Sequence, residues 1–349
     1  MRNYRGALEH LITSYWYFDS YTSLLFSPLS ILALLVVKIR RFILISFFQR
    51  KEVRPVVIVV GNITVGGTGK TPLVMYIANL FSNRGFKVAI ALRGYGSVKP
   101  IKTEWISDSD SDDAYLSDEA KLFINNGFIV GIGKNRPAVI EKIEDKHAPD
   151  IIICDDGMQH YQLHRNLEIC VVDGMRGFGN NQIIPFGPLR ESTARLKSVD
   201  MIISKDKRFD SAYLMKYKVS RIYSIKYPDY DMLIYPLQNS KVHAVTGIGN
   251  PGQFFSMLRS LDIKIIEHVF PDHYNFSEND LMFDDGLPIV MTEKDAVKCI
   301  DFGLDNCYVL SIMLEIDEKF SLDLLNKLEV ILDDKQKITR NISVPNLQG

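Results

Sequence analysis

The chain has 349 residues, 46% of them apolar, which is long for one domain and favours two globular parts with sizeable cores. Its formal net charge of −1 at pH 7 gives no overall attraction to nucleic acid, so an anionic partner must be met locally. The four cysteines form no Cys-x-x-Cys pair, which favours core thiols in a reducing compartment over a zinc or disulfide framework.

Residues 1–54 are predicted to associate with a membrane. Pro28 suits the first turn of a helix that reaches about residue 49, with apolar residues at spacings of three or four. The uninterrupted apolar run, residues 24–37, has only 14 residues, against about 20 needed to cross a bilayer. Residues 38–54 carry six cations and one acid, which suits an anionic membrane face. We therefore expect a helix lying in one leaflet; a buried core helix with a basic edge is the alternative.

The sequence pattern centres on a β-branched strand at residues 56–60, a glycine-rich turn and an amphipathic helix. Such a turn aims backbone N–H groups at an anion, and the helix N-terminus adds partial positive charge, so the pattern predicts a phosphate-binding loop. Lys70 would reach the β- and γ-phosphates, and the Thr71 hydroxyl would ligate Mg²⁺. The expected nucleotide-binding residues are Thr64, Val65, Gly66, Gly67, Thr68, Gly69, Lys70 and Thr71. Thr64 departs from the usual pattern, which has glycine there.

Two further predicted strands end in charged residues. The strand at residues 88–92 leads into Arg93, a candidate substrate contact, because α/β proteins place ligand groups at the carboxyl ends of parallel strands. The strand within residues 150–156 ends in Asp155 and Asp156. P-loop enzymes use such strand-end aspartates to hold Mg²⁺ or its water opposite the threonine hydroxyl. Together with the phosphate loop, these aspartates predict a P-loop nucleotide site.

Other polar positions leave alternatives open. On residue type alone, Asp118 is favoured as part of a helix N-cap. The cations of the loop that contains Arg136 either meet a phosphate or face water. Arg190 either stabilises phosphoryl charge or pairs with Glu191. His273 lies among polar and aromatic residues, where an imidazole can meet a carboxylate, and is a catalytic candidate.

The domain organisation that we expect places a P-loop domain at residues 55–225 and a connector at 226–240. A smaller α/β domain at 241–335 and a polar tail at 336–349 follow. The loop Gly247–Gly252 matches the dinucleotide pattern G-x-G-x-x-G after a strand, which supports a rival hypothesis, a nicotinamide- or flavin-dependent oxidoreductase. Against it, such patterns are individually weak, and Pro251 lies where the last glycine should be opening a helix.

Nine motifs occur in order: GNITVGGTGKTP, RGYG, SDE, GKNR, DDGMQH, PFGPLRE, GIGNP, FPDHYNF and TEKDAVK. They closely resemble those of the tetraacyldisaccharide 4′-kinase family, the lipid A 4′-kinases of Gram-negative bacteria. The resemblance implies a P-loop NTPase-like α/β fold, with a mostly parallel sheet flanked by helices, an N-terminal amphipathic membrane helix and a smaller C-terminal α/β domain. In this family the loop GGTGKTP follows Asn-x-Thr, which accounts for Thr64, and the GIGNP loop does not signify nicotinamide.

The resemblance also implies an activity and a location. The family phosphorylates the 4′-hydroxyl of a tetraacylated glucosamine disaccharide 1-phosphate with ATP and Mg²⁺ during lipid A biosynthesis. The expected partners are this acylated lipid and the anionic cytoplasmic face of the inner membrane, with no nucleic acid and no protein partner. A third hypothesis is a non-catalytic membrane-associated P-loop switch, whose ATP consumption would not depend on a lipid acceptor.

Site roles follow from the same resemblance. Asp118 becomes the base toward the sugar hydroxyl, with His273 as its partner, which replaces the N-cap interpretation. The catalytic set is Asp118, His273, Lys70, Asp156 and Arg190. The Mg²⁺ ligands are Thr71, Asp155, Asp156 and Glu191, and the lipid substrate contacts are Arg93, Arg136, Gln159 and His160. Met158 departs from the family, which usually has an aromatic residue there, and is expected to change packing rather than chemistry.

Overall fold

The computed structural model describes residues 12, 14–17, 27–47, 51–94, 105–107, 116–227, 231–232, 237–249, 251–271 and 274–343. The chain divides into two compact units. The first comprises Met1–Met215 and Ile316–Gly349, and the second comprises Lys216–Glu315. Both divisions fall within strands, β8 (Tyr213–Ser224) and β13 (Cys307–Ile316).

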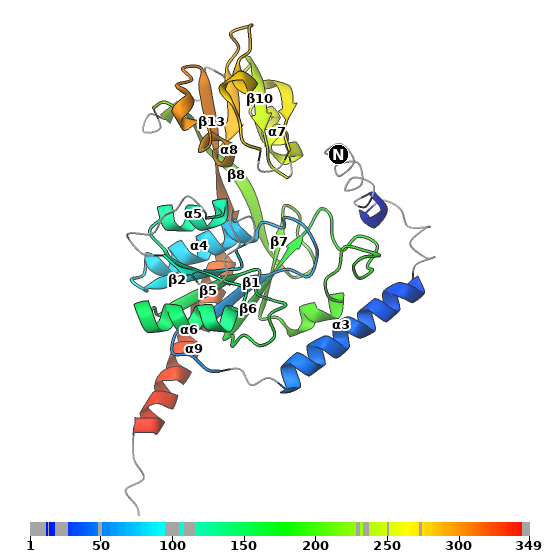
Figure 1. Ribbon diagram of the computed structural model, residues 1–349, viewed down its shortest axis with the longest axis vertical. Coiled ribbons are helices and arrows are strands. Elements are labelled where there is room, and N and C mark those ends of the chain that lie inside the picture. The colour runs from blue at the N-terminus through cyan, green and yellow to red at the C-terminus, as the bar shows by residue number, and fades with distance from the viewer. Residues whose placement is uncertain are drawn as a thin grey trace, which may run out of the picture. The chain divides into compact units, whose positions relative to one another are not determined.

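The first unit is built on a mostly parallel sheet (Figure 1). Its strands are β1 (Val56–Gly61), β2 (Val88–Leu92), β3 (Trp105–Ile106), β4 (Ile129–Ile132), β5 (Ile151–Asp155), β6 (Leu167–Asp173) and β7 (Met201–Lys205). The order is β8-β7-β6-β1-β5-β2-β4-β3, and of these only β3 runs antiparallel to its neighbour. Both faces of the central strands are buried, which is why β1 and β5 are continuous apolar runs without alternation.

Helices cover both faces of this sheet. Figure 1 shows α4 (Lys70–Ser82) and α5 (Asp118–Asn125) on one face and α6 (Arg136–His147) on the other. The polar residues that start these helices act locally: Ser117 caps α5 and Asn135 caps α6 by accepting a hydrogen bond from a backbone N–H of the first turn. A short 3-10 helix, η2 (Thr193–Ser198), precedes β7.

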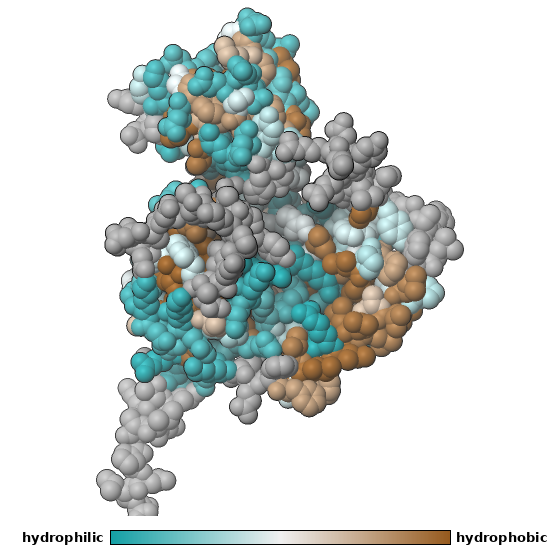
Figure 2. Space-filling model, in the orientation of Figure 1, coloured by the Kyte–Doolittle hydropathy of each residue, from teal (hydrophilic) through white to brown (hydrophobic). Residues whose placement is uncertain are grey.

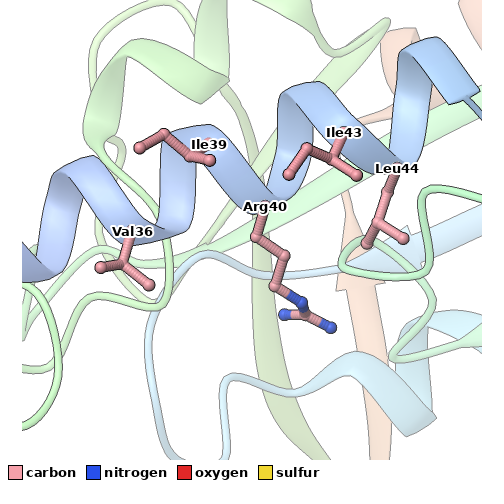
Figure 3. Close-up of a pocket in the computed structure, with 5 residues that line it drawn as sticks. All are labelled: Val36, Ile39, Arg40, Ile43 and Leu44. Carbon is pink, nitrogen blue, oxygen red and sulfur yellow. The ribbon is translucent and has the colours of Figure 1, made fainter.

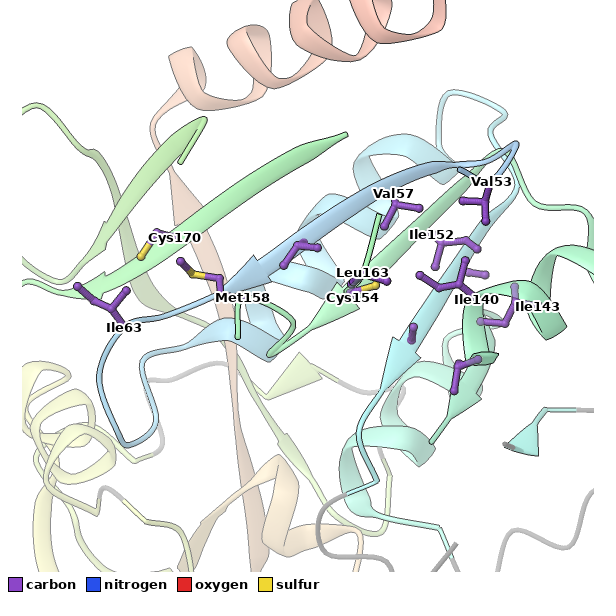
Figure 4. Close-up of a cluster of buried hydrophobic side chains, with 14 of the residues drawn as sticks. Val53, Val57, Ile63, Ile140, Ile143, Ile152, Cys154, Met158, Leu163 and Cys170 are labelled. Atoms are coloured by element: carbon purple, nitrogen blue, oxygen red, sulfur yellow. The ribbon is translucent and has the colours of Figure 1, made fainter. Parts of the chain in front are cut away.

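The core under α6 combines residues from the sheet and the helix (Figure 4). Ile152 and Cys154 of β5 lie beside Ile140 and Ile143 of α6, while Met158 extends the cluster beyond the strand end. A Cβ on Gly61 would lie 2.4 Å from Met158 Cγ, so this methionine packs directly on the end of β1. All four cysteines are buried thiols, as predicted.

The long helix α9 (Glu318–Ser343) belongs to the first unit. The hydroxyls of Tyr76, on α4, and Ser321 are 2.8 Å apart. The ammonium of Lys335 donates to three successive carbonyls, those of Val53 at 2.7 Å, Arg54 at 3.0 Å and Pro55 at 2.9 Å. The structure therefore differs from the expected boundaries: residues 316–335 join the first unit because they pack on it, and α9 extends into the predicted polar tail.

The second unit is a smaller α/β unit, as the family resemblance implied. Its strands are β9 (Asp231–Met232), β10 (Lys241–Thr246), β11 (Lys264–Val269), β12 (Ile289–Thr292), β13 and β8, in the order β11-β10-β12-β13-β8, with β9 on β8. Its helices are α7 (Pro251–Ser260), α8 (Glu293–Ala296), η3 (Glu278–Leu281) and η4 (Ile300–Phe302). Its apolar residues form two clusters, one including α7 and one including residues of α8 and η3.

The N-terminal amphipathic helix is α3 (Ser27–Phe47), close to the predicted bounds. It carries an unusually apolar surface, which Figure 2 shows as a continuous brown area where Figure 1 places α3. Its exposed apolar residues are Leu29, Ile31, Leu32, Leu35, Val36, Ile39, Phe42, Ile43, Ile45 and Phe47. Within the described part of the chain, no helix combines the length and apolarity that a membrane crossing requires.

Candidate active site

The turn between β1 and α4 forms a loop whose shape depends on two glycines. Gly66 has a φ of 109° and Gly69 a φ of 87°, a conformation that residues with a side chain rarely adopt. Asn62 Nδ2 donates to Thr68 Oγ1 at 3.1 Å, which ties the start of the loop to its end. No side chain caps α4 at Gly69, so the first N–H groups of this helix can meet an anion.

Asp155, at the end of β5, faces the start of α4. The pairing of Val60 with Asp155 places it beside the end of β1. Thr71 Oγ1 donates to Asp155 Oδ2 at 2.9 Å, whereas Asp155 Oδ1 is buried and has no hydrogen-bond partner among the described residues. Burial raises the pKa of Asp155, against the opposing charge of Lys70. An unsatisfied buried carboxylate oxygen beside a threonine hydroxyl is suited to a hard cation.

Asp156 has a left-handed backbone, with a φ of 52°, and turns its carboxylate toward two cations. Arg190 Nη1 donates to Asp156 Oδ1 at 2.8 Å and to Oδ2 at 3.0 Å, and Lys70 Nζ lies 3.6 Å from Oδ1. Burial by itself would raise the pKa of Asp156, but Lys70 and Arg190 outweigh it and the pKa is lowered. Left-handed backbone in a residue other than glycine is concentrated at functional sites, which fits this position.

Arg190 reaches the phosphate loop because two distant segments pair through their backbones. The N–H of Arg190 donates to the Ile63 carbonyl at 2.7 Å, and the N–H of Val65 donates to the Pro188 carbonyl at 2.8 Å. Thr64 and Leu189 form an antiparallel bridge between these two contacts. The sequence leaves two roles open for Arg190: stabilising phosphoryl charge or pairing with Glu191. Among the described residues, its guanidinium donates to Asp156, and no pairing with Glu191 is seen.

Gln159, predicted to contact substrate, connects the groups of this site. Its Nε2 donates to the Asn62 carbonyl at 3.0 Å and to Glu191 Oε1 at 2.9 Å. Its Oε1 accepts from Arg190 Nη1 at 3.3 Å. Gln159 thus links the phosphate loop to Arg190 and, separately, to Glu191.

Glu191 also belongs to a buried ionic network that sequence reasoning missed. Its Oε2 lies 3.4 Å from Arg195 Nε. Arg195 pairs in addition with Glu168, on β6, and Arg165 Nη1 approaches Glu168 Oε1 to 2.5 Å. Neither Arg195 nor Glu168 belongs to a recognisable sequence motif. The only sequence signal for a buried partner was a single charged residue next to an apolar strand.

Arg136 is completely buried, although loop cations are ordinarily exposed. Its Nη2 donates to the carbonyl oxygen of Asp155 at 2.8 Å, while Nε and Nη1 have no hydrogen-bond partner among the described residues. Burial lowers the pKa of Arg136, and the negative charges of Asp155 and Asp156 oppose this effect. The interpretation in which this residue simply faces water is therefore wrong.

His160 lies close to two of the arginines predicted to contact substrate. Burial, with added repulsion from Arg136 and Arg93, lowers the pKa of His160 to about 4. Arg93 directly follows β2 and is exposed. The four predicted substrate contacts thus lie near the carboxyl ends of adjacent strands, and His160 is neutral at pH 7.

The predicted Asp118–His273 dyad is not tested by these contacts. Ser117 is the N-cap of α5, and its side chain accepts from the Ala120 N–H. Asp118 is the first helical residue, but its side chain lies outside what the structure describes, and so does all of His273. Their pairing remains a prediction.

A strand, a glycine-rich loop and a helix present Lys70 beside a strand-end aspartate and an arginine, which defines a P-loop protein built for phosphoryl transfer. A family model described as tetraacyldisaccharide-1-P 4′-kinase (LpxK) matches residues 22–329. The chain belongs to this family. This membership overrules the oxidoreductase hypothesis, although α7 does begin at Pro251, directly after the glycine-containing loop.

Individual relatives agree with this assignment. The tetraacyldisaccharide 4′-kinase of Hahella chejuensis is 39% identical over 317 residues, covering 87% of this chain and 92% of that protein. The protein of the same name from Nitrosococcus oceani is 38% identical over 333 residues, covering 94% and 97%. The crystal structure of the "apo" form of LpxK from Aquifex aeolicus in complex with ATP has a TM-score of 0.71 and 26% identity, covering 88% of this chain and 99% of that chain.

Proposed function

We propose that this chain uses ATP to phosphorylate the 4′-hydroxyl of a tetraacylated glucosamine disaccharide 1-phosphate in lipid A biosynthesis. One observation carries the proposal: in a chain of this kinase family, Lys70 and Arg190 both meet Asp156 at the phosphate loop. Two cations held beside one strand-end carboxylate can stabilise the negative charge that is spread over a phosphoryl group during its transfer.

The nucleotide occupies the loop Thr64–Thr71 in this proposal. Backbone N–H groups and the N-terminus of α4 hold the triphosphate, and Lys70 contacts its β- and γ-phosphates. Bound Mg²⁺ would supply charge neutralisation for the phosphates. We assign Mg²⁺ to the expected ligands Thr71, Asp155, Asp156 and Glu191. The buried Asp155 oxygen without a partner, beside the Thr71 hydroxyl, supports the first two. Among the described residues no three carboxylate, imidazole or thiol groups are gathered for a metal, so ligation by Asp156 and Glu191 stays a prediction.

The acceptor hydroxyl is aligned by Asp118, with His273 as its partner. A phosphoryl-transfer transition state is loose, so the base need only hold the hydroxyl in line and accept its proton. General-base assistance of this kind contributes about 10²–10⁴-fold to turnover. Arg93, Arg136, Gln159 and His160 are proposed to receive the polar disaccharide.

The lipid substrate and α3 place the reaction at a membrane. Moving acyl chains out of a bilayer costs about 0.8 kcal/mol per methylene, so the enzyme must act where the lipid lies. The exposed apolar residues of α3 are interspersed with the exposed cations Lys38 and Arg40, and this combination suits an anionic bilayer surface. We therefore propose peripheral or monotopic attachment to the cytoplasmic face of the inner membrane.

The test is transfer of labelled γ-phosphate from ATP to a tetraacyl disaccharide 1-phosphate in detergent micelles, with Lys70→Ala and Asp118→Ala in parallel. We expect label in the lipid for the wild type and little for either variant. Asp118→Ala should lower turnover about 10²–10⁴-fold and keep nucleotide affinity, because its role is in the chemical step.

Two results would contradict parts of this proposal. An equal loss of nucleotide affinity in Asp118→Ala would remove Asp118 from the base role. ATP hydrolysis by the wild type without labelled lipid would favour the membrane-associated switch, whose nucleotide consumption does not depend on an acceptor.

A further inference from the structure

Helix α3 rests directly on the loop that carries Arg190 and Glu191. The Ile183 N–H donates to Ser30 Oγ at 3.1 Å, and Ser30 is buried. Leu34 packs against a core cluster that includes Ile183. A small cavity remains along this contact, lined by Ser30, Ile31, Leu34, Asn181, Gln182, Ile183, Leu189, Ser192 and Thr193. Helix α3 therefore rests on loop residues that precede and follow Arg190 and Glu191 in the chain.

A second contact joins α3 to the same site. The guanidinium carbon of Arg41 lies 5.5 Å from the centre of the Tyr161 ring, over its face. Arg41 is half-buried and Tyr161 is buried. Burial raises the pKa of Tyr161, and the adjacent negative charge of Glu191 raises it further. Tyr161 thus lies between a cation of α3 and the carboxylate of Glu191.

Glu191 in turn leads to the phosphoryl-transfer residues. It accepts from Gln159 at 2.9 Å, Gln159 accepts from Arg190 at 3.3 Å, and Arg190 donates to Asp156 at 2.8 Å. The steps from Glu191 to Asp156 are hydrogen bonds between side chains, and the step from Tyr161 to Glu191 is the electrostatic effect of a nearby carboxylate on the phenol.

We propose that Tyr161 is a positioning residue that transmits the seating of α3 to Arg190 and Asp156, with Arg41 as its contact on the helix. When α3 rests on the loop, its apolar face points outward and Arg41 covers Tyr161. Lipid that binds the outward face therefore favours the arrangement in which Arg41 contacts Tyr161. Tyr161 then holds Glu191, and through Gln159 the guanidinium of Arg190, in the geometry for transfer. The inference rests on the proposed kinase function.

Helix α3 offers a matched pair of cations for the test. Arg40 is exposed and lines a shallow apolar depression with Val36, Ile39, Ile43 and Leu44 (Figure 3), whereas its neighbour Arg41 covers Tyr161. Arg40→Ala and Arg41→Ala each remove one charge from the same helix, so both should weaken binding to vesicles of phosphatidylethanolamine and phosphatidylglycerol similarly. At saturating vesicles that contain the lipid substrate, only Arg41→Ala should lower kcat, by about three- to thirtyfold.

Two further variants separate positioning from a structural role. Tyr161→Phe keeps the ring under Arg41 but removes the hydroxyl beside Glu191, so it should lower kcat without changing vesicle binding. Arg41→Lys retains a cation and should recover part of the lost kcat. In the double variant with Arg41→Ala and Tyr161→Phe, the losses in kcat should be less than additive, because both interrupt the same connection. Thermal unfolding midpoints should match the wild type.

Equal kcat values for Arg40→Ala and Arg41→Ala, or additive losses in the double variant, would overturn the inference and leave the kinase function standing. If Tyr161→Phe does not fold, the comparison of Arg40→Ala with Arg41→Ala still decides. A wild type that transfers no phosphate to the lipid in the same vesicles would overturn the proposed function and the inference with it.

Discussion

Asp155 and Asp156 are adjacent in the chain yet have opposite pKa shifts. Burial dominates for Asp155 and raises its pKa, although Lys70 and the Thr71 hydrogen bond oppose it. For Asp156, Lys70 and Arg190 together exceed the effect of burial, so its pKa is lowered and it is ionised at neutral pH. The left-handed backbone of Asp156 separates the two carboxylates, turning one to the threonine hydroxyl and the other to the cations.

His160 gives a pH-dependent prediction at the same scale. Its pKa is about 4 in the folded protein, against the ordinary value of 6.5 for an unfolded chain. Between these values the unfolded state binds more protons, so this residue lowers stability as pH falls from 6.5 to 4. His160→Gln should remove the effect. Denaturant unfolding at several pH values should show the wild type losing stability relative to the variant below pH 6.5 and a constant difference above it.

A direct titration checks the same point. The ring C–H resonance of His160 in an NMR spectrum should shift with a midpoint near pH 4. A midpoint near 6.5, or a stability difference between wild type and His160→Gln that does not change with pH, would contradict the prediction.

At the scale of elements, a buried ionic network joins η2, β6 and the loop that carries Glu191. Arg195, on η2, pairs with Glu168, on β6, and with Glu191. All three side chains are buried, so each charge depends on the others to offset the loss of hydration. The network fixes the segment that follows Arg190, which is one reason that the Arg190 guanidinium is directed at Asp156.

Removing Arg195 should therefore be costly. Arg195→Ala leaves the carboxylates of Glu168 and Glu191 buried with less compensation, so we expect a loss of about 3–5 kcal/mol in the free energy of unfolding. Lys51→Ala is the control, because Lys51 and Glu141 form an exposed pair with side chains 72% and 39% exposed, and it should change stability by less than about 1 kcal/mol. Chemical denaturation followed by circular dichroism measures both; similar losses would show that burial does not govern this network.

At the scale of the whole molecule, exposed apolar side chains are concentrated on α3. Two of its residues, Ile39 and Phe42, are 56% and 67% exposed. Contiguous exposed apolar surface marks an interaction site, and nearby cations favour an anionic lipid as the partner. The same helix packs inward through Ala33, Leu34 and Val37, so attachment and packing occupy different faces.

Serine substitutions on the outer face should therefore weaken attachment and not folding. Ile39→Ser and Phe42→Ser should each reduce binding to anionic vesicles about tenfold, because each loses an apolar side chain that the bilayer would bury. Leu322→Ser is the matched control, because Leu322 is similarly exposed, at 61%, but lies on α9 and not on α3. This variant should bind vesicles as the wild type does. A vesicle flotation assay measures binding. If all three variants floated like the wild type, α3 would not be the attachment surface.

Local sequence determined the phosphate loop, the strand-end aspartates and the bounds of α3, because backbone conformation and apolar periodicity act over neighbouring residues. The family motifs added the kinase assignment. Only the tertiary structure decided that Arg190 meets Asp156, that Arg136 is buried against the Asp155 carbonyl, and that Tyr161 lies between Arg41 and Glu191. These contacts join residues far apart in the chain, through loops whose paths no local periodicity encodes. The buried charges among them are stable only because the fold brings their partners together.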